Sequence, residues 1–366
     1  MENRQEIEVK LARIREMMES RNLDGLYLKR QDNFSWLTAG GSNRVGIATE
    51  MGACGLLVTG DSQFAVTNNI EAPRMIREEK LEEKGFAVHS DLWHADREVA
   101  MVKDLVSGKI GADHGFPDAE NLAEAIKPLR YSLTPSEIDR YREVGREAAL
   151  ALEEVAVSIH PGDRECEVMG RLSLNLWSRG MDFSTVMCAA DNRISDYRHA
   201  IPTDQVIEKR VMIGGNMRKY GLVVCCTRFV NFEPVSKQLA RQYRDTVEID
   251  CILMANTVPE KSVQVPFRKG IEAYKSRGWE NEFSLHHQGG AIGYMPRDYR
   301  VGLSTKEIVQ ENQAFCWNPS ITGTKSEDTI LATSSGPEIL SGPIVFPKMS
   351  VEIEGMSFIR PDILIK

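Results

Sequence analysis

Apolar residues recur three and four positions apart in several stretches of the chain, which is the spacing of one buried helix face. In residues 6–20 this face is formed by Ile7, Leu11, Ile14 and Met18. Short apolar runs with the length of strands follow at 26–28, 55–59, 64–67, 86–89 and 109–112. A helix is predicted between two of these runs, at 96–106. Strands that alternate with helices predict an α/β layer up to about residue 130.

A new helix begins at Thr134, where the order Thr-Pro-Ser-Glu combines an N-cap, a proline at the first helical position and a capping box. The long apolar stripe that follows predicts one buried helix face. We therefore predict two domains, residues 1–132 and 133–366. In the second domain, helices are predicted at 164–178 and 236–256. Apolar strands are predicted at 211–213, 222–226, 314–317 and 329–332, with a last strand at 351–354 on a sheet edge.

The composition limits the class of protein. The 366 residues are 42% hydrophobic and 27% charged, which is ordinary for a globular chain of two domains. The net charge of -8 argues against nucleic acid or an anionic membrane surface as a partner. No apolar run is long enough to cross a bilayer, and the polar N-terminus is unlike a secretory signal. Seven cysteines without a CxxC pair favour a reducing, cytoplasmic location.

Four segments together resemble the creatinase, prolidase and aminopeptidase P family. They are Leu-Asp-Gly-Leu at 23–26, the stretch 33–40, Thr-Pro-Ser-Glu-Ile at 134–138, and Leu-His-His-Gln-Gly-Gly-Ala-Ile-Gly-Tyr at 285–294. The resemblance covers nearly the whole chain. It implies an α/β (α+β) fold, in which a creatinase-like N-terminal α/β domain is followed by a pita-bread C-terminal domain. By the same analogy we expect a homodimer.

That family holds two metal ions with two Asp, one His and two Glu. By resemblance these positions fall on Gly214, Cys225, Gly290, Asn318 and Glu327, so only Glu327 keeps a family ligand. Two divalent ions need several carboxylates and an imidazole to offset their charge and fix their geometry. The sequence therefore predicts no metal centre and no cofactor. A single soft-metal site built on Cys225 and His286 or His287 is an alternative that would require convergence by chance.

Creatinase, by resemblance, offers a metal-free precedent in which a histidine cleaves a C–N bond. His199 takes that acid–base role here, and Glu327 is expected to bind a cationic or amide group of the substrate. His286 is expected to line the cavity, whereas His287 should face away because neighbours on a strand alternate. Asn318 offers a side-chain amide that can donate or accept a hydrogen bond in the cavity.

Three more side chains complete the candidate substrate-binding set, and each has two interpretations. Arg228 forms an ion pair inside the domain or binds a substrate carboxylate. Arg297 belongs to a solvated loop or shapes the rim of the pocket. Cys225 is a buried, inert thiol or a nucleophile that would need a histidine base.

Three functions remain open at this point. The leading hypothesis is a metal-independent hydrolase of a small C–N-bonded metabolite. The alternatives are a non-catalytic ligand-binding protein and a conventional Xaa-Pro metallopeptidase. In each case the expected partner is a small molecule, not nucleic acid or a membrane.

Overall fold

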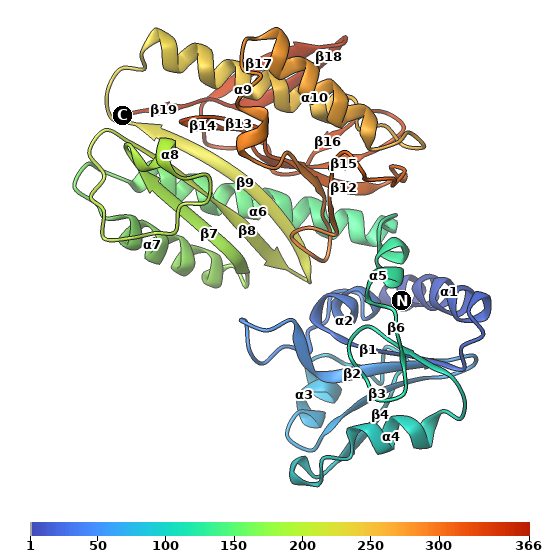
Figure 1. The fold of residues 1–366 in the computed structure, drawn as a ribbon. Coiled ribbons are helices and arrows are strands. Elements are labelled where there is room, and N and C mark those ends of the chain that lie inside the picture. Colours follow the sequence, from blue (N-terminus) through green and yellow to red (C-terminus); the bar gives the residue numbers. More distant parts are fainter. Residues whose placement is uncertain (1) are drawn as a thin grey trace. The chain divides into compact units, whose positions relative to one another are not determined.

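The computed structural model describes residues 2–366 (Figure 1). The chain divides into two compact units, Met1–Glu137 and Ile138–Lys366, a few residues after the predicted boundary at 132/133. Each unit mixes helices and strands, as the sequence predicts. No helix among residues 2–366 combines the length and the apolar character needed to cross a bilayer.

The N-terminal unit is built on a six-stranded sheet in the order β4-β3-β2-β1-β5-β6. The central pairs β1–β2 and β2–β3 are antiparallel, and the outer pairs are parallel. The strands are β1 (Gly25–Arg30), β2 (Met51–Thr59), β3 (Gln63–Asn68), β4 (Ala87–Asp91), β5 (Ile110–Ala112) and β6 (Glu120–Asn121). Parallel strands cannot be joined by a tight hairpin, and helices lie between β1 and β5 and between β3 and β4 in the sequence.

The helices of this unit are α1 (Glu2–Ser20), α2 (Gln31–Leu37), α3 (Ala72–Arg77), α4 (Glu98–Leu105) and α5 (Ala123–Ile126), with short 3₁₀ turns η1 (Trp93–Ala95) and η2 (Lys127–Arg130). The predicted apolar face of α1 is buried, since Ile7, Leu11, Ile14 and Met18 are each at most 4% exposed. At Thr134 the predicted capping box is present: its backbone N–H donates to Glu137 Oε2 at 2.8 Å.

The C-terminal unit contains two main sheets, β19-β9-β8-β7 and β11-β10-β12-β15-β16. The first consists of β7 (Asp182–Ala190), β8 (Arg210–Lys219), β9 (Leu222–Asn231) and β19 (Leu364–Ile365). The second consists of β10 (Gly289–Ala291), β11 (Tyr299–Arg300), β12 (Gln313–Trp317), β15 (Asp328–Ala332) and β16 (Glu338–Ile339). Two hairpins are formed by β13 (Ser320–Ile321) with β14 (Thr324–Lys325), and by β17 (Lys348–Ile353) with β18 (Met356–Pro361). The predicted strand at 351–354 thus belongs to a hairpin and not to the edge of a larger sheet.

Helices pack against these sheets (Figure 1). They are α6 (Pro135–Ser158), α7 (Glu165–Ser178), α8 (Arg193–Asp196), α9 (Lys237–Ala255) and α10 (Gln264–Ser276), with the 3₁₀ turn η3 (Phe283–Leu285). Helix α6 is tied to β9 because Tyr141 Oη donates to the Val223 carbonyl at 2.5 Å. Helix α9 begins where it was predicted, with Ser236 as a side-chain N-cap, and packs against α10, β14 and β17. Helix α10 was not predicted.

Candidate functional site

The five positions that correspond by resemblance to the family's metal ligands lie on strands of the C-terminal unit or next to their ends. Cys225 on β9 donates its backbone N–H to Thr329 Oγ1 on β15 at 2.9 Å, and Thr227 on β9 donates to Glu327 Oε2 at 2.7 Å. A Cβ atom on Gly214 would lie 2.6 Å from Thr227 Oγ1, and one on Gly290 would lie 2.2 Å from the carbonyl oxygen of Tyr299. Neither glycine position therefore has room for a ligand side chain.

Two cationic side chains surround the one remaining carboxylate. Lys325 Nζ lies 3.0 Å from Glu327 Oε2, and Arg297 Nη2 lies 3.9 Å from Glu327 Oε1. Lys325 and Glu327 are 4% and 3% exposed. One carboxylate that is already paired with two cations does not fit a pair of divalent ions. The residues present therefore do not match a two-metal centre. Arg297 comes from the loop between β10 and β11, but its side chain is only 18% exposed because it turns towards Glu327.

The charge of Glu327 contributes to stability in a pH-dependent way. Burial would raise the pKa of Glu327, but Lys325, Arg297 and the hydrogen bond from Thr227 outweigh burial and lower the pKa to about 2, from an ordinary value of 4.5. A carboxyl group with a lowered folded-state pKa stabilises the fold above pH 4.5, and this contribution is lost as the pH falls towards 2. Its size is at most roughly 3 kcal/mol.

A Glu327→Gln variant is expected to be less stable than the unaltered chain at pH 7, and the difference should narrow as the pH falls from 4.5 towards 2. Urea unfolding at pH 7, 4.5 and 3 measures both free energies of unfolding. The matched control is Glu83→Gln, since the Glu83 side chain is 73% exposed. A Glu327→Gln difference that is the same at pH 7 and pH 3 would contradict the lowered pKa.

Two buried thiols, Cys225 on β9 and Cys316 on β12, complete this cluster. Arg297 contacts both, with Nη1 and Nη2 each 3.9 Å from one sulfur atom, and Cys316 Sγ lies 3.7 Å from Glu327 Oε1. A hydrogen bond from Cys316, together with the charge of Arg297, lowers the pKa of the Cys225 thiol despite its burial. Cys225 is completely buried and its sulfur faces Arg297. These contacts support the interpretation of Cys225 as a buried thiol and not as a substrate-binding group.

Arg228 also lies entirely inside the unit. Its Nε donates to Glu153 at 2.9 Å and its Nη1 to Asp328 at 3.1 Å, while Nη2 donates to the Ser341 carbonyl at 2.8 Å. The side chain is 0% exposed. These contacts support the ion-pair interpretation of Arg228 and not the substrate-binding one.

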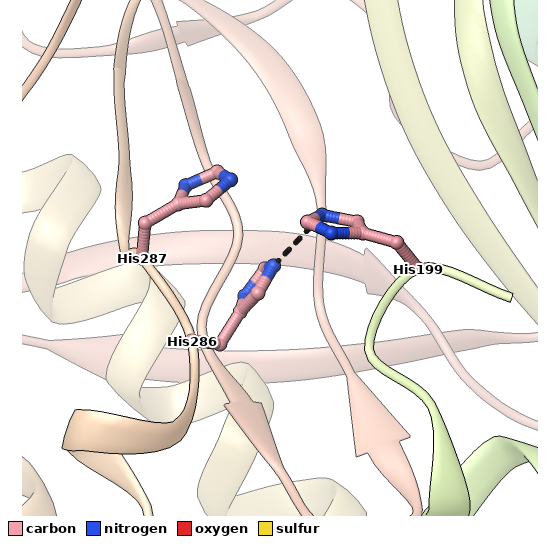
Figure 2. A group of neighbouring side chains, drawn as sticks. All are labelled: His199, His286 and His287. Carbon is pink, nitrogen blue, oxygen red and sulfur yellow. Dashed lines mark hydrogen bonds between the residues drawn. The ribbon is translucent and has the colours of Figure 1, made fainter.

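Three histidines gather beside these positions (Figure 2). His199 comes from the loop after α8, and His286 and His287 come from the segment between η3 and β10. One nitrogen atom of each ring lies within 4.8 Å of the others. The prediction that His287 faces away is wrong, because residues 286–288 precede β10 and strand alternation does not apply to them.

The three-histidine cluster lines a cavity of about 490 Å³, a size suited to a small molecule. The apolar part of the wall comes from Phe267, Phe283, Leu285 and Val301. His199 is the exposed member of the cluster, and His286 and His287 are partly buried. We call this cavity the three-histidine pocket.

The hydrogen bonds of the cluster determine which ring nitrogens carry protons. His286 Nδ1 lies 3.3 Å from the carbonyl oxygen of Asn318, and His286 Nε2 lies 3.1 Å from His199 Nε2. A carbonyl oxygen only accepts, so Nδ1 of His286 carries the proton and its Nε2 is the acceptor. His199 therefore donates from Nε2, and its Nδ1 has the free lone pair. Asn318 contributes to the site through its main chain, and not through its side-chain amide as predicted.

All three imidazoles are held in the neutral form near pH 7. Burial lowers the pKa of His286 to about 3, and the nearby charge of Lys325 acts in the same direction. Burial also lowers the pKa of His287 to about 4, with Arg297 adding to the effect. Partial burial of the ring, together with the charge of Lys325, lowers the pKa of His199. Neutral imidazoles can accept a proton or bind a metal ion.

Lys325 is the site residue that the sequence analysis missed. It stands two positions before Glu327, and residues at this spacing along an extended chain point to the same side. A basic residue two positions before the retained glutamate was therefore a usable signal.

Comparison with known proteins defines the class. The family model for metallopeptidase family M24 matches residues 139–354, and the creatinase/prolidase N-terminal domain model matches residues 10–144. The chain belongs to metallopeptidase family M24, a family of peptidase-type hydrolases, and has the predicted creatinase-like and pita-bread domains.

Individual relatives agree with this class. An uncharacterized peptidase of Staphylococcus aureus (strain USA300) is 24% identical over 257 residues, which cover 66% of this chain and 70% of the relative. The prolidase from Pyrococcus horikoshii OT3 has a TM-score of 0.76 at 18% identity and covers 92% of this chain and 98% of its own. The Xaa-Pro dipeptidase from Bacillus anthracis has a TM-score of 0.75 at 18% identity, with 98% and 100% covered. At these identities the solved structures establish the fold alone.

Proposed function

We propose that the chain hydrolyses a C–N bond in a small substrate bound in the three-histidine pocket, without the two-metal centre of its family. The observation that carries the proposal is the contrast between two neighbouring groups of side chains in one unit. The positions of the family's ligands hold one carboxylate already paired with Lys325 and Arg297. The three-histidine pocket instead offers neutral imidazoles at the wall of a cavity of about 490 Å³.

His199 is the residue that we expect to transfer protons in the absence of a metal ion. It is the exposed member of the cluster, and its Nδ1 has the free lone pair. That nitrogen can take a proton from water as the water attacks, and can return it to the leaving nitrogen of the substrate. General acid–base catalysis by a positioned side chain contributes about 10²- to 10⁴-fold to a rate. His286 is a positioning residue, since it accepts the hydrogen bond from His199 and fixes its tautomer.

A second candidate function is that of a conventional Xaa-Pro peptidase, which the names of the solved relatives favour. This activity would require a two-metal centre at the family's ligand positions. It therefore predicts two metal ions per chain and cleavage of Xaa-Pro dipeptides that stops when these ions are removed.

Substrate screening combined with metal analysis tests these functions. The purified full chain is incubated with Xaa-Pro dipeptides, with other small amides and with guanidino compounds, and released amine is measured. Multiple turnover of one compound with fewer than two metal ions per chain is the expected result. Two bound ions with Xaa-Pro cleavage would favour the second candidate, and binding without turnover would indicate a non-catalytic ligand-binding protein.

A homodimer and a cytoplasmic location also form part of the proposal. The homodimer is supported by analogy with the family. The cytoplasmic location is supported by the cysteines, since all seven are free thiols in the described chain. Light scattering of the purified chain after size-exclusion chromatography measures the number of subunits.

A further inference from the structure

We propose that His199, His286 and His287 form a site for a single divalent transition-metal ion, of the class of Zn²⁺ or Co²⁺. Its ligands differ from those of the family, although the site adjoins the family's ligand positions, since His286 Nδ1 lies 3.3 Å from the carbonyl oxygen of Asn318. The inference rests on the proposed function for the role of the pocket, and it names the cofactor that this pocket would take.

The spacing of the ring nitrogens is close to that of ligands on one ion. Zn–N distances of about 2.0–2.1 Å in a tetrahedral site place two ligand nitrogens about 3.3–3.4 Å apart. Nε2 of His199 and Nε2 of His286 are 3.1 Å apart, and the ligand atoms of all three histidines lie within 4.8 Å. A small rotation of the His199 side chain would complete the coordination, because this residue is exposed and lies on a loop.

The groups around the cluster orient the histidines as metal ligands usually are. A ligating histidine commonly donates its other ring N–H to a carbonyl oxygen, which fixes the ring and its tautomer. His286 has this contact through Nδ1, which lies 3.3 Å from the Asn318 carbonyl oxygen. Within residues 2–366, Nδ1 of His287 is buried and has no hydrogen-bond partner. Such an atom needs an acceptor, a water molecule or an ion to offset the cost of its burial.

The ligand set also indicates the class of ion. Imidazole nitrogens suit Zn²⁺, Co²⁺, Ni²⁺ and Cu²⁺, whereas Ca²⁺ and Mg²⁺ prefer oxygen. Three protein ligands beside an open cavity leave the fourth position for water or substrate, which is the arrangement of catalytic zinc sites. The site would therefore bind one ion with an open coordination position facing the cavity of about 490 Å³.

The nearby charges act in two directions. Lys325 and Arg297 are close enough to lower the pKa values of the histidines, so they also repel a dication, and Glu327 offsets them only in part. The same cations favour ionisation of a metal-bound water molecule, since hydroxide is an anion. With the ion bound, His199 is a ligand and the ion supplies the activated water. Without the ion, His199 is the base.

Metal binding by the full chain tests the inference without any substrate. The chain is stripped with a chelator and titrated with Zn²⁺ alone by calorimetry and with Co²⁺ by visible absorption. We expect one ion per chain and the visible bands of tetrahedral Co²⁺. His286→Ala and His287→Ala should each weaken binding at least about tenfold, by loss of one of three ligands.

Two control variants test whether the ion binds at these three histidines and not elsewhere on the chain. His94→Ala removes an exposed histidine of the N-terminal unit and should bind as the unaltered chain does. Cys225→Ser removes the ligand of the alternative soft-metal site and should also have no effect. Loss of binding in Cys225→Ser, or unchanged binding in both pocket variants, would overturn the inference. For the unaltered chain loaded with Cu²⁺, paramagnetic resonance should detect three coordinated nitrogens, and fewer than two would also overturn it.

The outcomes for the ion and for the proposed hydrolysis are distinguishable. One bound ion without turnover of any compound would support the metal site and contradict the proposed function. Turnover by a chain that binds no ion would support the proposed function, with His199 as the base, and contradict the metal site.

Discussion

Replacing His199 by glutamine is expected to lower turnover by about 10²- to 10⁴-fold. Glutamine keeps a polar side chain of similar length but can neither accept a proton near pH 7 nor replace an imidazole on a metal ion. Because His199 is exposed, the free energy of unfolding should change little. The measurement is the steady-state rate with the compound identified by screening, together with urea unfolding of both chains.

The matched control for this variant is His160→Gln, which changes an exposed histidine of the same unit that is not part of the cluster. Addition of free imidazole should restore part of the activity of His199→Gln, since a small base can enter the open side of the pocket. Undiminished turnover by His199→Gln would show that the three-histidine pocket does not catalyse the reaction. This holds whether His199 acts as the base or as a metal ligand.

The fold could be predicted from the sequence because its signals are local or repeated. The capping box at Thr134 and the cap at Ser236 each depend on residues within one turn, and both are present in the structure. Apolar strands such as 222–226 are recognisable from their own residues. Helix α10 was not predicted because the sequence before it contains no signal for a helix start. Its N-terminus has no side-chain cap.

The candidate site was only partly predictable, because its side chains meet through contacts between distant segments. The loss of the family's ligands was visible from Gly214, Gly290 and Asn318 alone. The pairing of Arg297 with Glu327 depends on how β10, β12 and β15 align, which the sequence does not display, whereas the pairing of Lys325 is local. The place of His287 depended on where a strand begins, and a boundary error of a few residues reverses the direction of a side chain.

Arg228→Met is expected to destabilise the C-terminal unit by about 3–5 kcal/mol, because removing one partner leaves buried charges uncompensated. Arg228 links Glu153 on α6 to Asp328 on β15, and all three side chains are 0% exposed. Methionine fills much of the same volume, so the change mainly removes the charge and its hydrogen bonds. Urea unfolding at pH 7 measures the difference in the free energy of unfolding.

The control for Arg228→Met is Arg142→Met on the same helix that carries Glu153. Arg142 also forms two short contacts with a carboxylate, at 2.8 and 2.9 Å from Glu338, but its side chain is 51% exposed. An exposed ion pair contributes at most about 1 kcal/mol, so this variant should be nearly as stable as the unaltered chain. If the two variants lowered the free energy of unfolding equally, burial of the ion pair would not explain the loss of stability.

The other hydrogen-bond donors of Glu153 and Asp328 determine where in the range of about 3–5 kcal/mol the destabilisation by Arg228→Met lies. Glu153 keeps three backbone N–H donors, from Ile344, Val345 and Phe346 at 2.8–3.2 Å. Asp328 keeps Arg360, whose Nη2 lies 3.0 Å from Oδ2. Since both carboxylates retain donors, the lower end of the range is expected. An Arg228→Met, Glu153→Gln double variant should then be less damaged than the sum of its single changes, because the second change neutralises one of the charges that the first leaves unpaired.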